Sequence, residues 1–146
     1  MKELLNVLLW LAGIGHFVVL IASFQVPWRL RWVEELPRLS AFNRKLMWVH
    51  GAFAILTITA FGLLTLLLHE DMLLGARAAL GIAAFIAIYW TARVAVDFLY
   101  YEHADWPKGP RFAVGHALLT GLFCALATTY WLLIFWHWRI AAGGNG

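Results

Sequence analysis

The chain has 146 residues, of which 63% are hydrophobic, and its mean hydropathy is +0.76. These values lie far above those of a soluble domain and exclude a protein that folds mainly in water. The net charge of +3 and the pI near 9.4 could indicate nucleic-acid binding, but the basic residues flank the apolar stretches. In that position they set membrane topology and meet lipid headgroups, so no nucleic-acid partner is expected.

Four long apolar stretches occupy nearly the whole chain, at about residues 4–26, 46–68, 74–100 and 112–136. Each is about as long as the roughly 20 residues that a helix needs to cross a membrane. The links between them are short, which makes consecutive helices antiparallel neighbours. The sequence therefore predicts an all-α fold, an integral membrane four-helix up-down bundle that forms one transmembrane domain over residues 1–146.

The first stretch has one property of a signal peptide, because Lys2 precedes an apolar run that reaches the small residues Ala22 and Ser23. The run is longer than the about 7 to 15 residues of a typical signal-peptide core, so we expect it to be retained as a spanning helix. His16 lies near its middle, where an ionisable side chain is costly and is therefore paired or turned to the interior.

The link after the first stretch, residues 28–43, interleaves tryptophan, leucine and valine with arginine and glutamate. Apolar positions three to four apart favour a short amphipathic helix at headgroup depth, broken near Pro37. Such a segment is either a plain connector or a docking surface for another protein, and the sequence leaves both open.

The distribution of basic residues predicts the orientation of the bundle. The opposite ends of the four stretches carry only Lys2, Arg77 and Arg139. Because cytoplasmic loops are enriched in lysine and arginine, both longer links are expected in the cytoplasm and both termini outside. The basic residues of these two links are Arg29, Arg31, Arg38, Arg44 and Lys45 in the first and Lys108 and Arg111 in the second.

Small residues give every predicted helix a face on which a neighbour can approach closely. Lipid tails provide no hydrophobic drive between helices, so close backbone packing must hold them together. We expect these faces to form the helix contacts. The glycines among them are Gly13, Gly15, Gly51, Gly62, Gly81, Gly115 and Gly121.

Two histidines, His50 and His116, each lie about one turn inside the cytoplasmic ends of the second and fourth helices. His16 lies about 8 to 10 Å deeper at a rise of about 1.5 Å per residue, which disfavours a compact three-histidine metal site. Matched depth on two parallel helices permits an iron between two imidazoles, so heme b bound by His50 and His116 is the sharpest hypothesis. The alternative is that each histidine bonds a backbone carbonyl, a threonine or interfacial water.

Arg93 and Asp97 stand one helical turn apart and can neutralise each other, with Tyr100 extending the same polar strip. A structural ion pair that holds the third helix to its neighbours is one interpretation. In the other, Arg93 meets a heme propionate, a quinone oxygen or a lipid phosphate, and Asp97 carries a proton or binds a metal beside His103. The acidic link around His103 lacks the ligand spacing that would make a metal site convincing.

Three stretches, FNRKLMWVHGAF, YWTARVAVDFLYYEHADWP and GHALLTGLF, resemble those of an uncharacterised family of small four-helix bacterial integral membrane proteins. The resemblance covers most of the chain. It implies the same fold and a bacterial inner membrane, and it brings no activity and no functional residues.

These observations favour a small subunit of a larger complex or a homo-oligomer over a self-contained enzyme, because no P-loop, dinucleotide fingerprint, C-x-x-C motif or serine elbow is present. One hypothesis is a subunit that binds heme b, or another tetrapyrrole, for electron transfer. The alternatives are a cofactor-free accessory or assembly subunit that packs against larger membrane proteins, and a lipid- or quinone-binding subunit around Arg93, Asp97 and His103. Membrane lipids are expected partners in every case.

Overall fold

The computed structural model describes residues 1–101 and 110–143, and every regular element in this part of the chain is helical. Four spans there are long and apolar enough to cross a membrane, so the predicted all-α membrane bundle is confirmed. The long helices are α1 (Lys2–Ser23), α4 (Ala41–Leu67), α6 (Arg77–Leu99) and α7 (Pro110–Gly143). The short ones are α2 (Val26–Arg29), α3 (Trp32–Glu35), the 3₁₀ turn η1 (Leu36–Arg38) and α5 (His69–Leu74).

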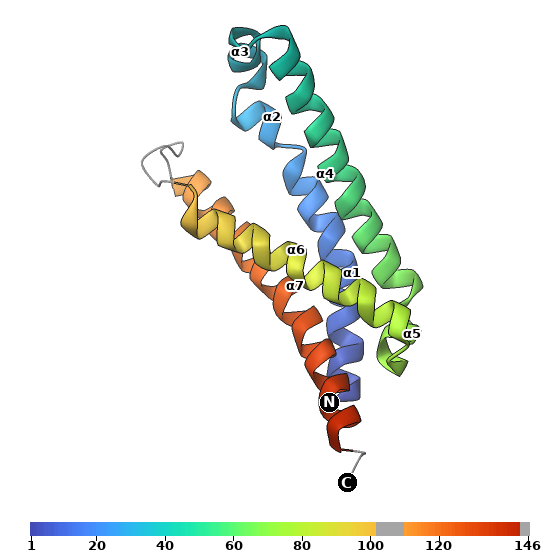
Figure 1. Cartoon of the computed structure of the whole chain (residues 1–146). Helices are drawn as coiled ribbons and strands as arrows, with labels where there is room; N and C mark the ends of the chain where they lie inside the picture. The colour runs from blue at the N-terminus through green and yellow to red at the C-terminus, as the bar shows by residue number, and fades with distance from the viewer. Residues whose placement is uncertain (102–109, 144–146) are drawn as a thin grey trace.

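The long helices form two antiparallel pairs that cross each other (Figure 1). One pair is α1 with α4, the other is α6 with α7, and α1 also packs against α7. Both termini and α5 lie at one end of the molecule, where the pairs are in contact. The pairs diverge toward the other end, which carries α2 and α3.

The start of α4 and the end of α7 differ most from the expected boundaries. Helix α4 begins at Ala41 rather than near residue 46, because the Ser40 hydroxyl accepts a hydrogen bond of 3.3 Å from the Asn43 backbone N–H and caps the first turn. Helix α7 continues to Gly143 rather than ending near residue 136, so its last turns are helical although the apolar run has stopped.

The link between α1 and α4 breaks at a different residue than expected. Arg31 adopts a left-handed backbone conformation with φ of 52°, and the chain turns there between α2 and α3. Pro37 lies inside the 3₁₀ turn η1, in its first positions, where a missing N–H group is tolerated. Two exposed ion pairs, Arg31 with Glu34 at 2.8 Å and Arg38 with Glu35 at 3.1 Å, complete this end.

The turn at the opposite end is fastened by the last helix. Gly75 ends α5 with φ of 78°, a conformation that suits glycine, and a Cβ atom there would lie 2.6 Å from His137 Nδ1. The other ring nitrogen of His137, Nε2, donates to the Met72 carbonyl at 3.1 Å. Helix α7 therefore closes over the α5 turn.

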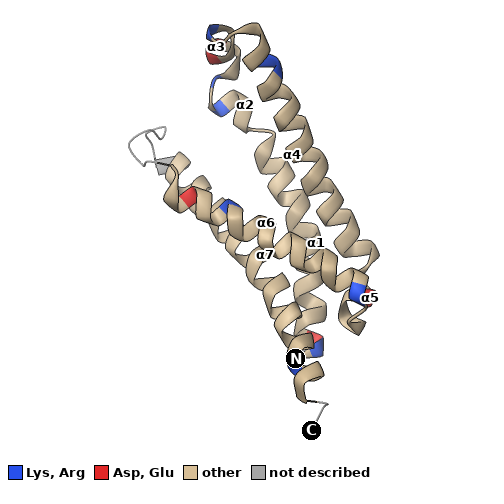
Figure 2. Ribbon diagram, in the orientation of Figure 1, with Lys and Arg blue, Asp and Glu red and all other residues tan. Residues whose placement is uncertain are grey.

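Charged side chains lie mainly at the ends of the bundle, and the middle of the molecule is almost free of them (Figure 2). The exception is α6, which carries Arg93 and Asp97 within its spanning region. This arrangement agrees with integration into a membrane.

Close packing uses only some of the expected glycines. A Cβ on Gly13 would lie 2.5 Å from the Leu66 side chain, and one on Gly62 would lie 3.0 Å from the Phe17 ring. Helices α1 and α4 thus approach through glycine, as expected for membrane helices. In contrast, a Cβ on Gly81, Gly115 or Gly121 meets nothing within 4 Å, so these three positions lie outside the tight contacts.

Replacing Gly62 with leucine is expected to destabilise the α1–α4 pair by about 1–3 kcal/mol, because the new side chain overpacks against Phe17 and His16. Gly81→Leu is the matched control, since it makes the same change in helix propensity at an open position. The free energy of unfolding of each variant is measured in mixed micelles and compared with that of the wild type. Equal stabilities would contradict the packing described here.

Candidate functional site

His16 belongs to a buried hydrogen-bond network that joins α1 to α6. Its side chain is fully buried, and its Nδ1 atom lies 2.7 Å from the Ala12 carbonyl oxygen. The Trp90 indole N–H donates to His16 Nε2 at 3.0 Å. Because an indole N–H can only donate, Nε2 is the acceptor and the proton sits on Nδ1, where it bonds the carbonyl. Both nitrogens are engaged, which favours the paired-histidine interpretation over a cofactor ligand.

A second hydrogen bond joins α7 to α4 at the same depth. The Thr65 hydroxyl donates to the Phe61 carbonyl at 2.7 Å, so the Tyr130 hydroxyl, 2.6 Å away, donates to Thr65. The His16 ring contacts the rings of Phe61, Trp90 and Tyr130, with centroids 5.6 to 6.0 Å apart. We call His16, Thr65, Trp90 and Tyr130 the core network.

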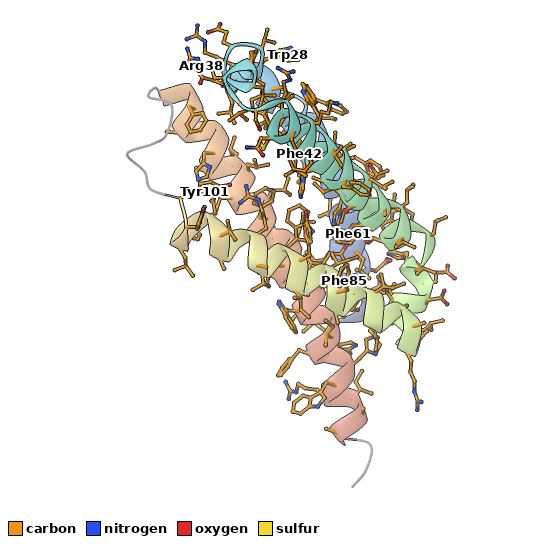
Figure 3. All side chains as sticks on the ribbon, turned by 45° about the horizontal axis from the view of Figure 1, so that its top comes forward. Trp28, Arg38, Phe42, Phe61, Phe85 and Tyr101 are labelled. Atoms are coloured by element: carbon orange, nitrogen blue, oxygen red, sulfur yellow. The ribbon has the colours of Figure 1, made fainter. Side chains whose placement is uncertain are left out.

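Phe61 also marks the side of the core network that faces α6. Its ring lies 5.8 Å from that of Phe85 and 5.0 Å from that of Tyr89, and Figure 3 shows Phe61 and Phe85 between α4 and α6. Trp28, Arg38 and Phe42 lie at the end that carries α2 and α3. The aromatic core is therefore well separated from the link.

The second group of intramembrane polar residues surrounds Asp97, whose side chain is only 5% exposed. The Thr120 hydroxyl donates to Asp97 Oδ2 at 2.8 Å, and His116 Nε2 lies 3.2 Å from the same oxygen. The expected pairing with Arg93 is present but loose, with 3.7 Å between Nη1 and Oδ1. We call Arg93, Asp97, His116 and Thr120 the Asp97 cluster.

Arg93 is held by aromatic rings as much as by the carboxylate. Its guanidinium carbon lies 5.2 Å from the ring centroid of Phe123 and 6.0 Å from that of Tyr101. Its Nη1 atom is buried and makes no hydrogen bond to the described residues. A guanidinium over aromatic faces is stabilised in an apolar setting, so the two rings help to hold Arg93 beside Asp97.

His116 differs from the other described histidines in its partner. His16, His50, His69 and His137 each bond a backbone carbonyl oxygen. His116 Nε2 instead lies 3.2 Å from the Asp97 carboxylate, and it also lies 3.4 Å from the Thr120 hydroxyl. An imidazole next to a carboxylate is a common arrangement in proton-transfer sites.

The structure brings together three of the residues predicted from sequence, Arg93, Asp97 and His116. It does not bring His50 to them, because His50 is exposed on α4, with Nδ1 2.9 Å from the Leu46 carbonyl oxygen. Helix α4 packs along α1, whereas His116 faces α6. The heme hypothesis for His50 and His116 thus stays a prediction.

Three further residues of the predicted site lie apart. His16 belongs to the core network. Tyr100 follows the end of α6, is 78% exposed and contacts Tyr101. His103 lies outside the described residues.

A cleft of about 260 Å³ separates the end of α1 and α2 from the first turns of α7. It lies where the two helix pairs diverge in Figure 1. His116 lines this cleft and at the same time contacts Asp97, so the Asp97 cluster reaches the cleft wall. We call this space the His116 cleft. Its lining residues are Ala22, Gln25, Val26, Arg29, Leu30, Phe112, Gly115, His116 and Leu119.

Sequence reasoning missed Trp90, Tyr130 and Thr65 of the core network. A tryptophan in the middle of a spanning helix, away from the interface that this residue prefers, was the available signal, because a buried indole N–H needs an acceptor. Thr120 was also missed as a partner of Asp97, although it stands one turn after His116.

Comparison of the chain with protein-family models, with curated proteins and with solved structures finds no match. The core network, the Asp97 cluster and the His116 cleft are therefore the features from which a function is inferred.

Replacing His16 with leucine is expected to lower the free energy of unfolding by about 1–3 kcal/mol, since the Trp90 N–H loses its buried acceptor. The double variant His16→Leu/Trp90→Phe removes donor and acceptor together and is expected to lose less than the two single variants combined. The free energies of unfolding of the wild type, the two single variants and the double variant, measured in mixed micelles, give the coupling energy between His16 and Trp90. Additive losses within about 0.5 kcal/mol would refute the bond.

Proposed function

We propose that this protein is a small membrane subunit that binds a quinone-type amphiphile in the His116 cleft. The observation that carries the proposal is the position of His116, which lines an otherwise mainly apolar cleft and has the Asp97 carboxylate 3.2 Å behind it. Polar groups within a membrane are costly, and those that reach a cavity commonly mark a ligand or proton pathway.

The chemistry of the cleft suits a quinone better than a purely apolar ligand. A quinone head is an apolar ring with two carbonyl acceptors, and its reduction requires protons as well as electrons. Gln25, Arg29 and His116 are the polar members of the lining, and Asp97 and His116 together form a proton-transfer pair. In a complex, the electrons would come from a partner redox subunit.

The size of the cleft also favours a single ring. Its volume of about 260 Å³ lies just below the roughly 300 Å³ at which pockets for drug-sized ligands begin. A ring head fits such a space, and the isoprenoid tail can remain in the lipid. Gly115 contributes no side chain here, and a Cβ at this position would meet nothing within 4 Å, so it leaves the cleft open.

His116→Phe is expected to weaken quinone binding at least about tenfold, because it removes the polar contact and the link to Asp97. His50→Phe is the matched control, since His50 is an exposed helical histidine that lies outside the cleft lining. Titration of a fluorescent or spin-labelled short-chain quinone into nanodiscs that contain each variant measures the affinity. Unchanged binding in a folded His116→Phe protein would refute the proposal.

The visible absorption spectrum of the same samples distinguishes heme binding from quinone binding. Heme b ligation requires His50 Nε2 to face α7, and the bond between His50 Nδ1 and the Leu46 carbonyl is compatible with it. A Soret band lost in both His50→Ala and His116→Ala would favour heme, whereas the quinone proposal expects no dependence on His50. A colourless protein that binds no quinone and co-purifies with a larger membrane protein would favour the accessory-subunit alternative.

The proposed location is a bacterial inner membrane with both termini outside. Supporting this, the basic residues Arg29, Arg31, Arg38, Arg44 and Lys45 gather at the end opposite the two termini. Alkaline phosphatase fused after Gly143 is expected to be active and a green fluorescent protein there dark. A reporter inserted near Ser40 should give the reverse, and the same pattern at both positions would contradict this orientation.

A further inference from the structure

A second cavity lies between α4 and the segment from the end of α1 to α3, where Trp32 packs against Trp48. It has a volume of about 260 Å³ and is almost wholly apolar. Trp32 and Trp48 form its upper wall, with their rings perpendicular and their centroids 5.4 Å apart. Gly51, Ile55 and Ile58 continue the wall along α4. We call this space the Trp32 pocket; it shares no lining residue with the His116 cleft except Val26.

The strained backbone of Arg31 positions one wall of this pocket. A non-glycine residue with φ of 52° is unusual and persists only where its surroundings determine it. Here the turn directs the following residue, Trp32, back onto Trp48. The pocket is therefore built by the link, and the link is more than a connector.

The pocket wall on α4 is a single stripe that extends toward a basic end. Trp48, Gly51, Ile55 and Ile58 follow one another at spacings of three and four, and the residue one turn before Trp48 on this stripe is Arg44. Side chains on a helix lean toward its N-terminus, so Arg44 points away from the apolar wall and toward headgroup depth. The stripe is thus apolar from Trp48 to Ile58 and cationic at Arg44, near the start of α4.

The length of the stripe matches one half of a bilayer. From Trp48 to Ile58 at about 1.5 Å per residue the wall is about 15 Å long, which is half of the roughly 30 Å hydrocarbon core. An acyl chain of one leaflet can lie along it, and the attached phosphate then reaches the level of Arg44.

The end of the molecule near the pocket has more basic than acidic side chains, so it can attract an anion. Glu34 pairs with Arg31 and Glu35 pairs with Arg38. Arg44 and the neighbouring Lys45 have no carboxylate partner among residues 1–101 and 110–143. The two cations nearest the pocket stripe are therefore available to a ligand, unlike the two in ion pairs.

We infer that the Trp32 pocket binds an anionic phospholipid, with one acyl chain along Trp48, Gly51 and Ile55 and the phosphate against Arg44 and Lys45. This lipid would fasten the α2–α3 link to α4. The site is a different space from the proposed quinone site, because the two share no lining residue except Val26.

Native mass spectrometry of the delipidated protein with added phosphatidylglycerol or phosphatidylcholine tests this site. Wild-type protein is expected to retain phosphatidylglycerol more tightly. Arg44→Gln should weaken its binding about fivefold and leave phosphatidylcholine unaffected, as expected for one cation at a lipid surface. Arg38→Gln, which makes the same charge change at a residue already paired with Glu35, should have little effect.

A second variant tests the acyl chain. A Cβ on Gly51 has its nearest contact at 4.0 Å, on the Trp32 ring, so Gly51→Leu fits at its Cβ and fills the pocket. It should abolish retention of both lipids while the melting temperature stays near that of Gly81→Leu. Equal losses in Arg44→Gln and Arg38→Gln, equal retention of the two lipids, or a dimer that Gly51→Leu dissociates would each overturn the inference.

Discussion

The structure depends on a hydrogen-bonded aromatic contact in the middle of the bundle. Lipid tails are as apolar as leucine, so burying apolar surface between helices gives membrane proteins little stability. His16, Thr65, Trp90 and Tyr130 come from four different helices, and their bonds to one another and to backbone carbonyls give each of these four side chains a partner. This core network fixes which faces of α1, α4, α6 and α7 meet, and thereby where the pairs cross.

The crossing leaves the two ends of the molecule unlike each other. Toward the termini, α5 and the last turns of α7 close the bundle. Toward α2 and α3 the pairs diverge, and the space between them becomes the His116 cleft. The Trp32 pocket lies within the first pair, between α4 and the segment from the end of α1 to α3. The Asp97 cluster lies toward this diverging end, between α6 and α7, which remain packed against each other. The carboxylate is therefore buried, whereas His116 on α7 also lines the cleft.

The spans could be predicted because crossing a bilayer imposes a length and an apolar composition that the sequence displays directly. The pairing of Arg93 with Asp97 was predictable for a similar reason, since four residues make one turn within a single helix. The contact of Asp97 with His116 was not, because it depends on the rotation of α6 against α7. The glycines show why helix contacts cannot be predicted from the sequence alone. Gly13 and Gly62 lie in tight contacts, whereas Gly81 and Gly115 do not, although all four lie in similar apolar stretches.

The contact of His137 with the α5 turn bears on how the protein is made. Gly75 can adopt its left-handed conformation and donate its N–H to the Met72 carbonyl, at 3.3 Å, as soon as the second and third spans have entered the membrane. The second donor to that carbonyl, His137 Nε2, comes from a residue near the end of α7. The hairpin between these spans is therefore left incomplete during synthesis until the final helix has been inserted. A chain truncated before residue 137 would lack the imidazole that covers Gly75 and bonds Met72, and its turn should open more readily and become a target for membrane quality control.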